Sequence, residues 1–114
     1  MATGSKCIQL NKEHDLQETL KTNKNAIALV YASWCPFCAK FLPVFKKHAQ
    51  EGKRLFLLVQ DDEENIAGKY AINIFPTVLF FEKGMVANRL DGAPGIGLRE
   101  EQLIEFINSC PLPD

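Results

Sequence analysis

The segment Ala26–Tyr31 (AIALVY), followed closely by Trp34–Cys38 (WCPFC), decides the fold of this chain of 114 residues. The first segment is a continuous apolar run, which predicts a strand covered on both faces, as in a parallel sheet flanked by helices. The second places two cysteines two residues apart, at the expected start of a helix that extends to about Gln50. A C-x-x-C pair between a buried strand and a helix is typical of a redox dithiol.

Strand and helix signals alternate on both sides of this segment. Further strands are expected at 6–10, 55–59, 77–82 and 85–91, and further helices at 12–22, 64–70 and 99–109. Asn11 is expected to cap the first helix, and Gly52 to end the helix that begins at the cysteine pair. The order β-α-β-α-β-α-β-β-α predicts an α/β domain. Its largely parallel sheet should end in an antiparallel hairpin with a turn at 83–84.

Composition and charge restrict the classes of function. The formal net charge is −1 and 46% of the residues are hydrophobic, which fits a globular domain without a basic surface for nucleic acid or an anionic membrane. No apolar run approaches the roughly 18 residues of a membrane-spanning helix. Residues 1–6 also lack the apolar core of a secretory signal. We expect a cytoplasmic monomer with one domain at 6–110, a flexible segment at 1–5 and a tail at 111–114.

The C-x-x-C pair can be a redox dithiol, half of a zinc site or an accident of sequence. A structural zinc site needs four nitrogen or sulfur ligands, but there is no second cysteine pair, and His14 and His48 each stand alone. The redox interpretation is therefore favoured, and it requires neither a metal nor a cofactor. The other cysteines, Cys7 and Cys110, are expected to be ordinary thiols and not a structural disulfide, because stable bridges are rare in the cytosol.

The positions of the two cysteines suggest different roles. Cys35 would lie at a helix N-terminus, where unpaired backbone N–H groups and the helix dipole stabilise a thiolate, the attacking species in disulfide exchange. Cys38 follows after nearly one helical turn, so its sulfur can meet that of Cys35 and resolve a mixed disulfide. Pro36 suits the first turn because it has no N–H to leave unpaired. Trp34 and Phe37 are expected to form an apolar rim, with core packing as the alternative for both.

Several segments, in the same order and spacing, resemble the thioredoxin family from about residue 6 to 109. Residues 31–35 (YASWC) resemble the family's approach to its active site, and Pro43 lies where thioredoxins kink the active-site helix. Residues 74–77 (IFPT) resemble the cis-proline loop, and Gly92 falls in the loop that faces the substrate. The resemblance implies a thioredoxin fold, with a central mixed sheet of about five strands flanked by four helices.

The same resemblance implies a protein disulfide reductase. Its partners would be disulfide-containing proteins and a thioredoxin reductase-like electron donor. Pro76 would be in cis and face the dithiol, and the backbone of Phe75 would bind an extended substrate segment. Judged from the residues alone, Pro76 could instead simply begin the strand at Thr77. The competing functions are a disulfide oxidase or isomerase, and a binding module without catalysis.

The chain departs from the family in its core and in one loop. Thioredoxins and protein disulfide isomerases usually have a buried carboxylate six residues before the first cysteine, where this chain has Leu29. An ungapped count back from Pro76 places Leu57 where thioredoxins often have a lysine. The loss of both charges is structurally coherent, but it leaves Cys38 without the usual proton acceptor. Pro-Phe replaces Gly-Pro between the cysteines, and the loop at 92–97 is about four residues longer than usual.

Overall fold

The computed structural model describes residues 6–50 and 54–111. The described strands are β1 (Lys6–Leu10), β2 (Asn25–Tyr31), β3 (Leu55–Gln60), β4 (Thr77–Glu82) and β5 (Met85–Asp91). The described helices are α1 (Glu13–Thr22), α2 (Pro36–Ala49), α3 (Asn65–Lys69) and α4 (Glu100–Ser109). Their order confirms the sequence prediction. The predictions for Gly52 and for residues 1–5 and 112–114 lie outside the described residues.

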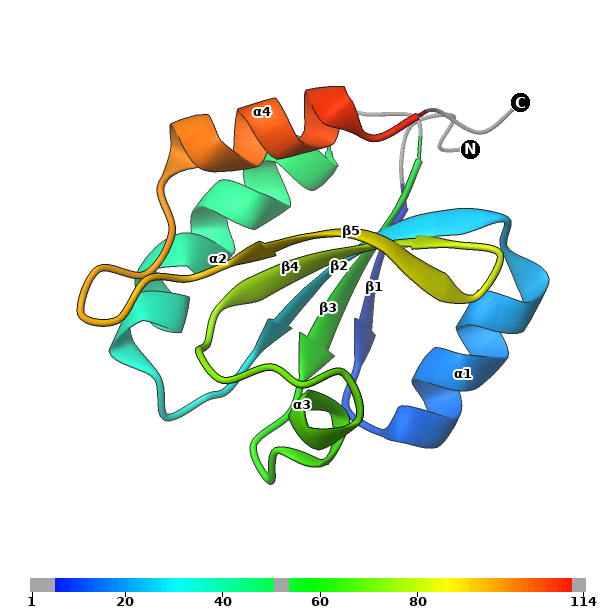
Figure 1. Cartoon of the computed structure of the whole chain (residues 1–114), viewed down its shortest axis with the longest axis horizontal. Helices are drawn as coiled ribbons and strands as arrows, with labels where there is room; N and C mark the ends of the chain where they lie inside the picture. Colours follow the sequence, from blue (N-terminus) through cyan, green and yellow to red (C-terminus); the bar gives the residue numbers. More distant parts are fainter. Residues whose placement is uncertain (1–5, 51–53, 112–114) are drawn as a thin grey trace.

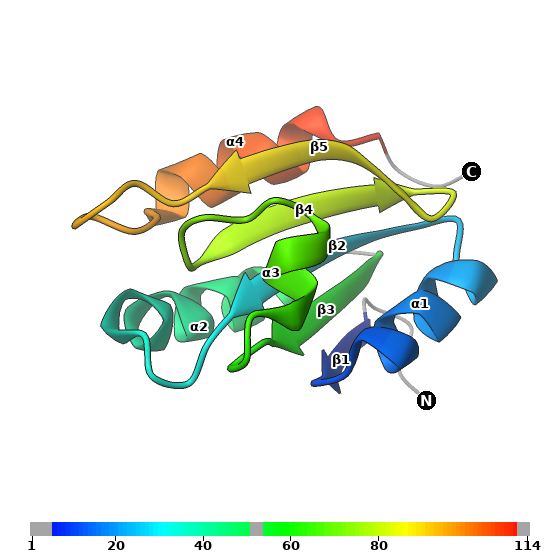
Figure 2. The same cartoon turned by 60° about the horizontal axis from the view of Figure 1, so that its bottom comes forward.

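The strands form one mixed sheet in the order β1-β3-β2-β4-β5, which Figure 2 shows from the side of α3. β1, β3 and β2 are parallel, whereas β4 is antiparallel to β2, and β5 is antiparallel to β4. Helices α2 and α4 cover one face of the sheet, and α1 and α3 cover the other (Figure 1). All seven residues of the central strand β2 are buried, because it has a neighbour on each edge and helices on both faces. The expected mixed five-stranded sheet with four helices is confirmed.

The two faces of the sheet form separate hydrophobic clusters. Leu29 and Leu58 belong to the cluster under α2 and α4, whereas Leu57 belongs to the cluster under α1 and α3. Leu29 is paired in register with Leu58 on the adjacent strand. The prediction that Leu57 takes the place of the lysine beside position 29 is therefore wrong. Side chains alternate between the two faces of a strand, so a count that is one residue off places the side chain on the opposite face.

The helices begin and end within one residue of the predicted bounds, but the cap of α1 differs from the prediction. Lys12, not Asn11, is the N-cap residue of α1, and no side-chain hydrogen bond caps this helix. Acidic side chains in the first turn, Glu13 and Asp15, instead complement the helix dipole. α2 begins directly after Cys35 and contains Pro43, as expected. Within the described residues, no helix combines the length and the hydropathy that crossing a membrane would require.

Candidate functional site

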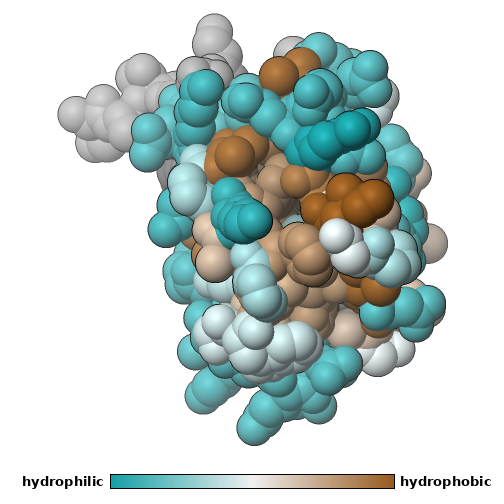
Figure 3. Space-filling model, turned by 90° about the vertical axis from the view of Figure 1, so that its left-hand side faces the viewer, coloured by the Kyte–Doolittle hydropathy of each residue, from teal (hydrophilic) through white to brown (hydrophobic). Residues whose placement is uncertain are grey.

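Three segments that are distant in the sequence meet at one end of the sheet. They are the start of α2, the loop between α3 and β4, and the loop between β5 and α4, all at the left of Figure 1. A cavity of about 220 Å³ lies between them. Figure 3 looks at this end of the molecule, where hydrophobic residues gather around a hollow with hydrophilic residues around them. The residues that line the cavity are Trp34, Cys35, Phe37, Glu64, Ile72, Asn73, Ile74, Phe75, Ala93, Pro94 and Gly95.

Cys35 lies on the wall of this cavity, as the N-cap residue of α2. Its side chain is largely buried, with 7% of the residue surface exposed. Its Sγ lies 3.6 Å from the carbonyl oxygen of Phe75, close enough for the thiol to donate a weak hydrogen bond. The Cys35 carbonyl accepts hydrogen bonds from the backbone N–H of Cys38 and of Ala39. The sulfur is thus held between the start of a helix and the backbone of the opposite loop.

Cys38 lies behind Cys35, away from the cavity, and is fully buried. It belongs to the cluster that contains Leu29 and Leu58, so the position where the family usually has a carboxylate is apolar here. The pKa of Cys38 is raised to about 12. Burial is the main cause, and the contact between the Cys38 and Cys35 thiols is the second. A hydrogen bond with the backbone of Ala32 acts in the opposite direction. Both cysteines of the motif are free thiols.

The loop before β4 is fixed by close backbone contacts. The peptide bond between Phe75 and Pro76 is cis, as the family resemblance implied. The Pro76 carbonyl accepts a hydrogen bond of 3.0 Å from the Gly92 N–H, and a Cβ atom at position 92 would lie only 2.6 Å from that oxygen. Thr77 Oγ1 donates to the Ile74 carbonyl at 2.6 Å. Gly92 is therefore required by the close approach of two backbones.

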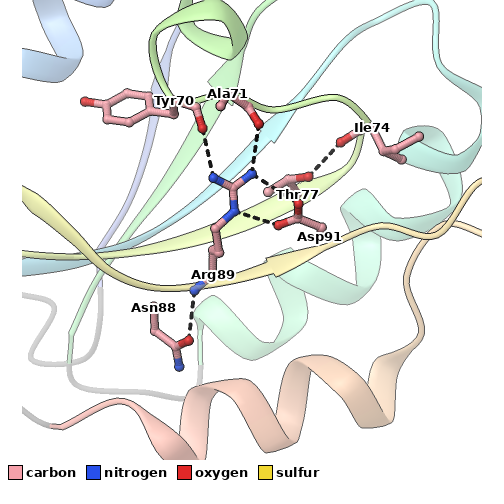
Figure 4. A network of polar contacts seen from close by, with 7 residues as sticks. All are labelled: Tyr70, Ala71, Ile74, Thr77, Asn88, Arg89 and Asp91. Atoms are coloured by element: carbon pink, nitrogen blue, oxygen red, sulfur yellow. Dashed lines mark hydrogen bonds and ion pairs between the residues drawn. The ribbon is translucent and has the colours of Figure 1, made fainter.

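A second set of contacts, which the sequence did not indicate, holds the same loop from the edge of the sheet (Figure 4). Arg89 on β5 donates hydrogen bonds to the carbonyls of Tyr70 and Ala71, at 2.8 and 3.3 Å. It also forms a bidentate ion pair with Asp91, with N–O distances of 2.7 and 3.1 Å. Ala71 has a left-handed backbone with φ of 54°. The guanidinium therefore fixes the chain directly before the cavity-lining residues 72–75.

A third set of contacts fixes the segment before the first cysteine. The carboxylate of Asp62 accepts hydrogen bonds of 2.7 Å from both the backbone N–H and the hydroxyl of Ser33. These bonds, together with one from Gln60, lower the pKa of Asp62. The Trp34 indole N–H donates to the Asp62 carbonyl at 3.1 Å, and its ring centroid lies 5.7 Å from that of Phe75. Trp34 is 58% exposed, so it is not a core residue.

The loop after β5 packs against the helix start. Ala93 and Gly97 form an isolated β-bridge that closes the loop on itself. Gly97 has φ of 80°, and a Cβ atom there would lie 3.0 Å from the Cβ atom of Phe37. Phe37 is thus half-buried under this loop, while Ile96 at its tip is 65% exposed. Residues 93–95 of this loop form one wall of the cavity.

The predicted site residues lie close to one another but differ in their position relative to the cavity. Trp34, Cys35, Phe37 and Phe75 line the cavity. Cys38 lies behind it, and Pro36, Pro76 and Gly92 belong to the backbone that frames it. Sequence reasoning missed Glu64, Asp62 and Arg89, which are single polar residues without a recognisable motif. In the parts of the chain that the structure describes, no three His, Cys, Asp or Glu side chains are grouped to hold a metal ion.

The chain is similar in sequence to thioredoxins and to larger disulfide isomerases. The thioredoxin of Mycoplasmoides gallisepticum is 35% identical over 85 residues, which are 73% of this chain and 85% of that protein. Protein disulfide-isomerase A5 of Bos taurus is 28% identical over 112 residues, which are 93% of this chain. The chain spans only 21% of the length of that isomerase.

Solved structures agree with these matches. A crystal structure of thioredoxin from Schistosoma mansoni superimposes with a TM-score of 0.78 at 26% identity, over 90% of this chain and 94% of that one. A mutant thioredoxin of Halobacterium salinarum, at 22% identity, shares the fold with the same TM-score over 99% of both chains. The family model for thioredoxin matches residues 6–109 and supports thiol–disulfide oxidoreductase chemistry in general. The chain belongs to the thioredoxin family.

Proposed function

We propose that the protein is a disulfide reductase for protein substrates. The Cys35 thiolate attacks one sulfur of a substrate disulfide, which forms a mixed disulfide and releases the other substrate sulfur as a thiolate. Cys38, after losing its proton, attacks the Cys35 sulfur and releases the second substrate sulfur. The substrate gains two electrons, and the Cys35–Cys38 disulfide remains. A thioredoxin reductase-like donor returns the two electrons, in a reducing compartment such as the cytoplasm.

The observation that carries this proposal is the position of the Cys35 sulfur, 3.6 Å from the Phe75 carbonyl on the wall of an apolar cavity. A substrate segment that pairs with the backbone at Phe75, in the manner of an added strand, brings its own cysteine to Cys35. Trp34 and Phe37 supply apolar surface around the reacting sulfurs. Since the recognition elements are backbone groups and apolar side chains, protein segments suit the site better than a small charged thiol.

The surroundings of Cys38 limit the rate of the second step, the resolution of the mixed disulfide. Burial, the main cause of the raised pKa of Cys38, persists when Cys35 is in the mixed disulfide, so the Cys38 thiol stays largely protonated near neutral pH. It must transfer its proton to water or to the departing thiolate, because the usual carboxylate position holds Leu29. We therefore expect resolution of the mixed disulfide to be slower than formation of that disulfide.

Insulin reduction and a measured redox potential together test the proposal. We expect the protein to reduce insulin in the presence of dithiothreitol, with a dithiol potential between about −270 and −200 mV. A protein that fails to accelerate insulin reduction, or whose potential lies near about −120 mV, is not a reductase.

Disulfide isomerisation is the second candidate function. It is favoured by the similarity to protein disulfide-isomerase A5, which extends over 93% of this chain. An isomerase must leave part of its dithiol pool oxidised, and its potential should lie near about −180 mV. Reactivation of scrambled ribonuclease, measured beside insulin reduction, separates the two functions, because a reductase leaves the scrambled protein reduced.

A further inference from the structure

The cavity beside Cys35 has an acidic side chain on its wall. Glu64 is the one charged residue among those that line the cavity, and apart from Asn73 the other side chains are apolar or belong to Cys35. Glu64 is exposed to solvent. None of the ion pairs among the described residues includes it. Within the described chain, the cavity therefore presents a carboxylate beside an apolar wall, without a cation paired to it.

The backbone at Glu64 is held in place before any substrate arrives. Its φ of 63° lies in the left-handed region, which is unfavourable for a residue with a side chain. The Glu64 N–H donates to the Asp61 carbonyl at 3.0 Å, and the Glu64 carbonyl accepts from Gly68 at 3.1 Å. The buried Asp61 carboxylate accepts hydrogen bonds from the N–H groups of Ile66 and Ala67, at 3.0 and 2.7 Å. This turn determines where the Glu64 side chain leaves the backbone.

The two residues before Glu64 in the sequence carry charges of the same sign. Asp62 and Glu63 precede it, and both are exposed. The carboxylate of Asp62 is already occupied by hydrogen bonds from Ser33 and Gln60. Glu63 lines a separate polar hollow on the other side of this turn. A run of acidic residues that includes Glu64 at this wall of the cavity favours a cationic group there.

We propose that Glu64 selects protein substrates that carry a lysine or arginine close to the reacting disulfide. This inference rests on the proposed reductase function. Lysine and arginine bury their aliphatic stems on apolar surface and keep their charged ends at the rim, which matches an apolar wall that ends at a carboxylate. Glu64 and Cys35 line the same small cavity, and an extended chain advances about 3.3 Å per residue. The cation therefore lies within a few residues of the substrate cysteine.

The role of Glu64 can be tested with three disulfide-bridged peptides that differ at one residue beside the cysteine. The variable residue is lysine, glutamine or glutamate, and the measured quantity is kcat/KM for reduction of each peptide. We expect the unaltered protein to prefer lysine over glutamine about threefold, and glutamine over glutamate by a similar factor. The substitution Glu64→Gln should bring the lysine-to-glutamate ratio close to one, and Glu64→Lys should invert it. High salt should reduce the preference, because the pair is close to solvent.

Glu63→Gln is the matched control, because it removes the same charge from the adjacent exposed residue that does not line the cavity. We expect it to retain most of the preference for lysine. If Glu63→Gln abolishes the preference as fully as Glu64→Gln does, the selection arises from the general field of the acidic turn, and the assignment to Glu64 is wrong. An unaltered preference in Glu64→Gln also overturns it. Thermal melts of each variant verify that the comparison is made between folded proteins.

A binding measurement separates this inference from the proposed function. The same peptides with serine in place of cysteine cannot exchange disulfides, so NMR titration with them reports only the dissociation constant. Tighter binding of the lysine peptide, lost in Glu64→Gln, supports the role of Glu64 even if no peptide is reduced, in which case only the reductase proposal fails. If all peptides are reduced but neither binding nor kcat/KM depends on their charge, the reductase proposal stands and the role of Glu64 is refuted.

Discussion

The two cysteines of one motif lie in contrasting surroundings. Cys35 lies on the cavity wall beside the Phe75 carbonyl and is surrounded by contacts that hold three loops in place. Cys38 does not line the cavity and is fully buried in the apolar cluster around Leu29, a cluster that Cys35 joins with 7% of its surface still exposed. The outer region comprises Cys35 and the loops around the cavity. It has the features that the family resemblance implied, including the cis peptide bond before Pro76 and the contact of Pro76 with Gly92. The inner region, around Cys38, has Leu29 where the family usually has a carboxylate. Under the proposed function, the chain thus has the family's groups at the place where a disulfide would be recognised and attacked, and differs where the exchange would be completed.

The largest effect is expected from replacing the two cysteines separately. Cys35→Ser should abolish insulin reduction, because no other described thiol lines the cavity. Cys38→Ser should retain the first attack and accumulate mixed disulfides, which mass spectrometry of the intact protein detects. If Cys35→Ser forms the adducts and Cys38→Ser does not, the assignment of outer nucleophile and inner resolving thiol is reversed.

The pH dependence of the resolving step is expected to be the next largest effect. In the mixed disulfide the contact with the Cys35 thiol is absent, but burial still raises the pKa of Cys38. Below that pKa, each pH unit increases the thiolate fraction about tenfold, so resolution should accelerate by up to about 100-fold between pH 7 and 9. Rapid-quench measurement of the decay of the mixed disulfide follows this step alone. A rate that levels off near pH 7 would show that an internal base removes the proton, and the contrast between the two regions would then be smaller than proposed.

Restoring charge in the inner region should destabilise the protein. Leu29→Asp buries a carboxyl group without a partner and should cost about 1–3 kcal/mol of unfolding free energy. Adding Leu58→Lys should recover part of this loss, because position 58 pairs with position 29 on the same face. Urea denaturation of the single and double variants gives the coupling free energy.

Leu57→Lys is the matched control for this cycle. It introduces the same charge one residue away, on the opposite face of the sheet. It should show little coupling to Leu29→Asp. Equal recovery by lysine at 57 and at 58 would contradict the assignment of the two leucines to separate faces.

A smaller effect is expected where two backbones meet in the outer region. Gly92→Ala would place a Cβ atom 2.6 Å from the Pro76 carbonyl, and the resulting displacement should cost about 1–2 kcal/mol of stability and lower insulin reduction. Gly68→Ala is the control, because a Cβ atom added there in α3 would meet nothing within 4 Å beyond its own helical turn. There, alanine should stabilise the helix slightly. Thermal unfolding distinguishes the two, and equal melting temperatures would show that the loop accommodates the extra carbon without strain.

The parts of this molecule that the sequence predicts are those with local signals. The apolar run at 26–31 determines β2, and the spacing of Cys35 and Cys38 places them at the start of α2. By contrast, the face occupied by Leu57 depends on the register between strands, which an ungapped count does not contain. Asn11 has the side chain of a helix cap, but the chain enters α1 one residue later.

The polar contacts around the cavity could not be predicted for a different reason. Arg89 lies on a strand with mostly exposed residues, and nothing in the sequence indicates that its guanidinium reaches the carbonyls of Tyr70 and Ala71. The bonds between Ser33 and Asp62 likewise join residues 29 positions apart. Such contacts depend on the tertiary structure and leave no periodic pattern in the sequence.

The bridge between Ala93 and Gly97 closes the loop after β5 on itself. Its two ends are held together by hydrogen bonds between the Ala93 and Gly97 backbones, so residues between them can change in number and type without moving β5 or α4. Gly92, which contacts Pro76, lies outside this closed unit. If the protein reduces protein substrates, as proposed, exchanging this loop between relatives should change which substrates it accepts, provided that the glycine at 92 and the bridge at 93 and 97 are kept.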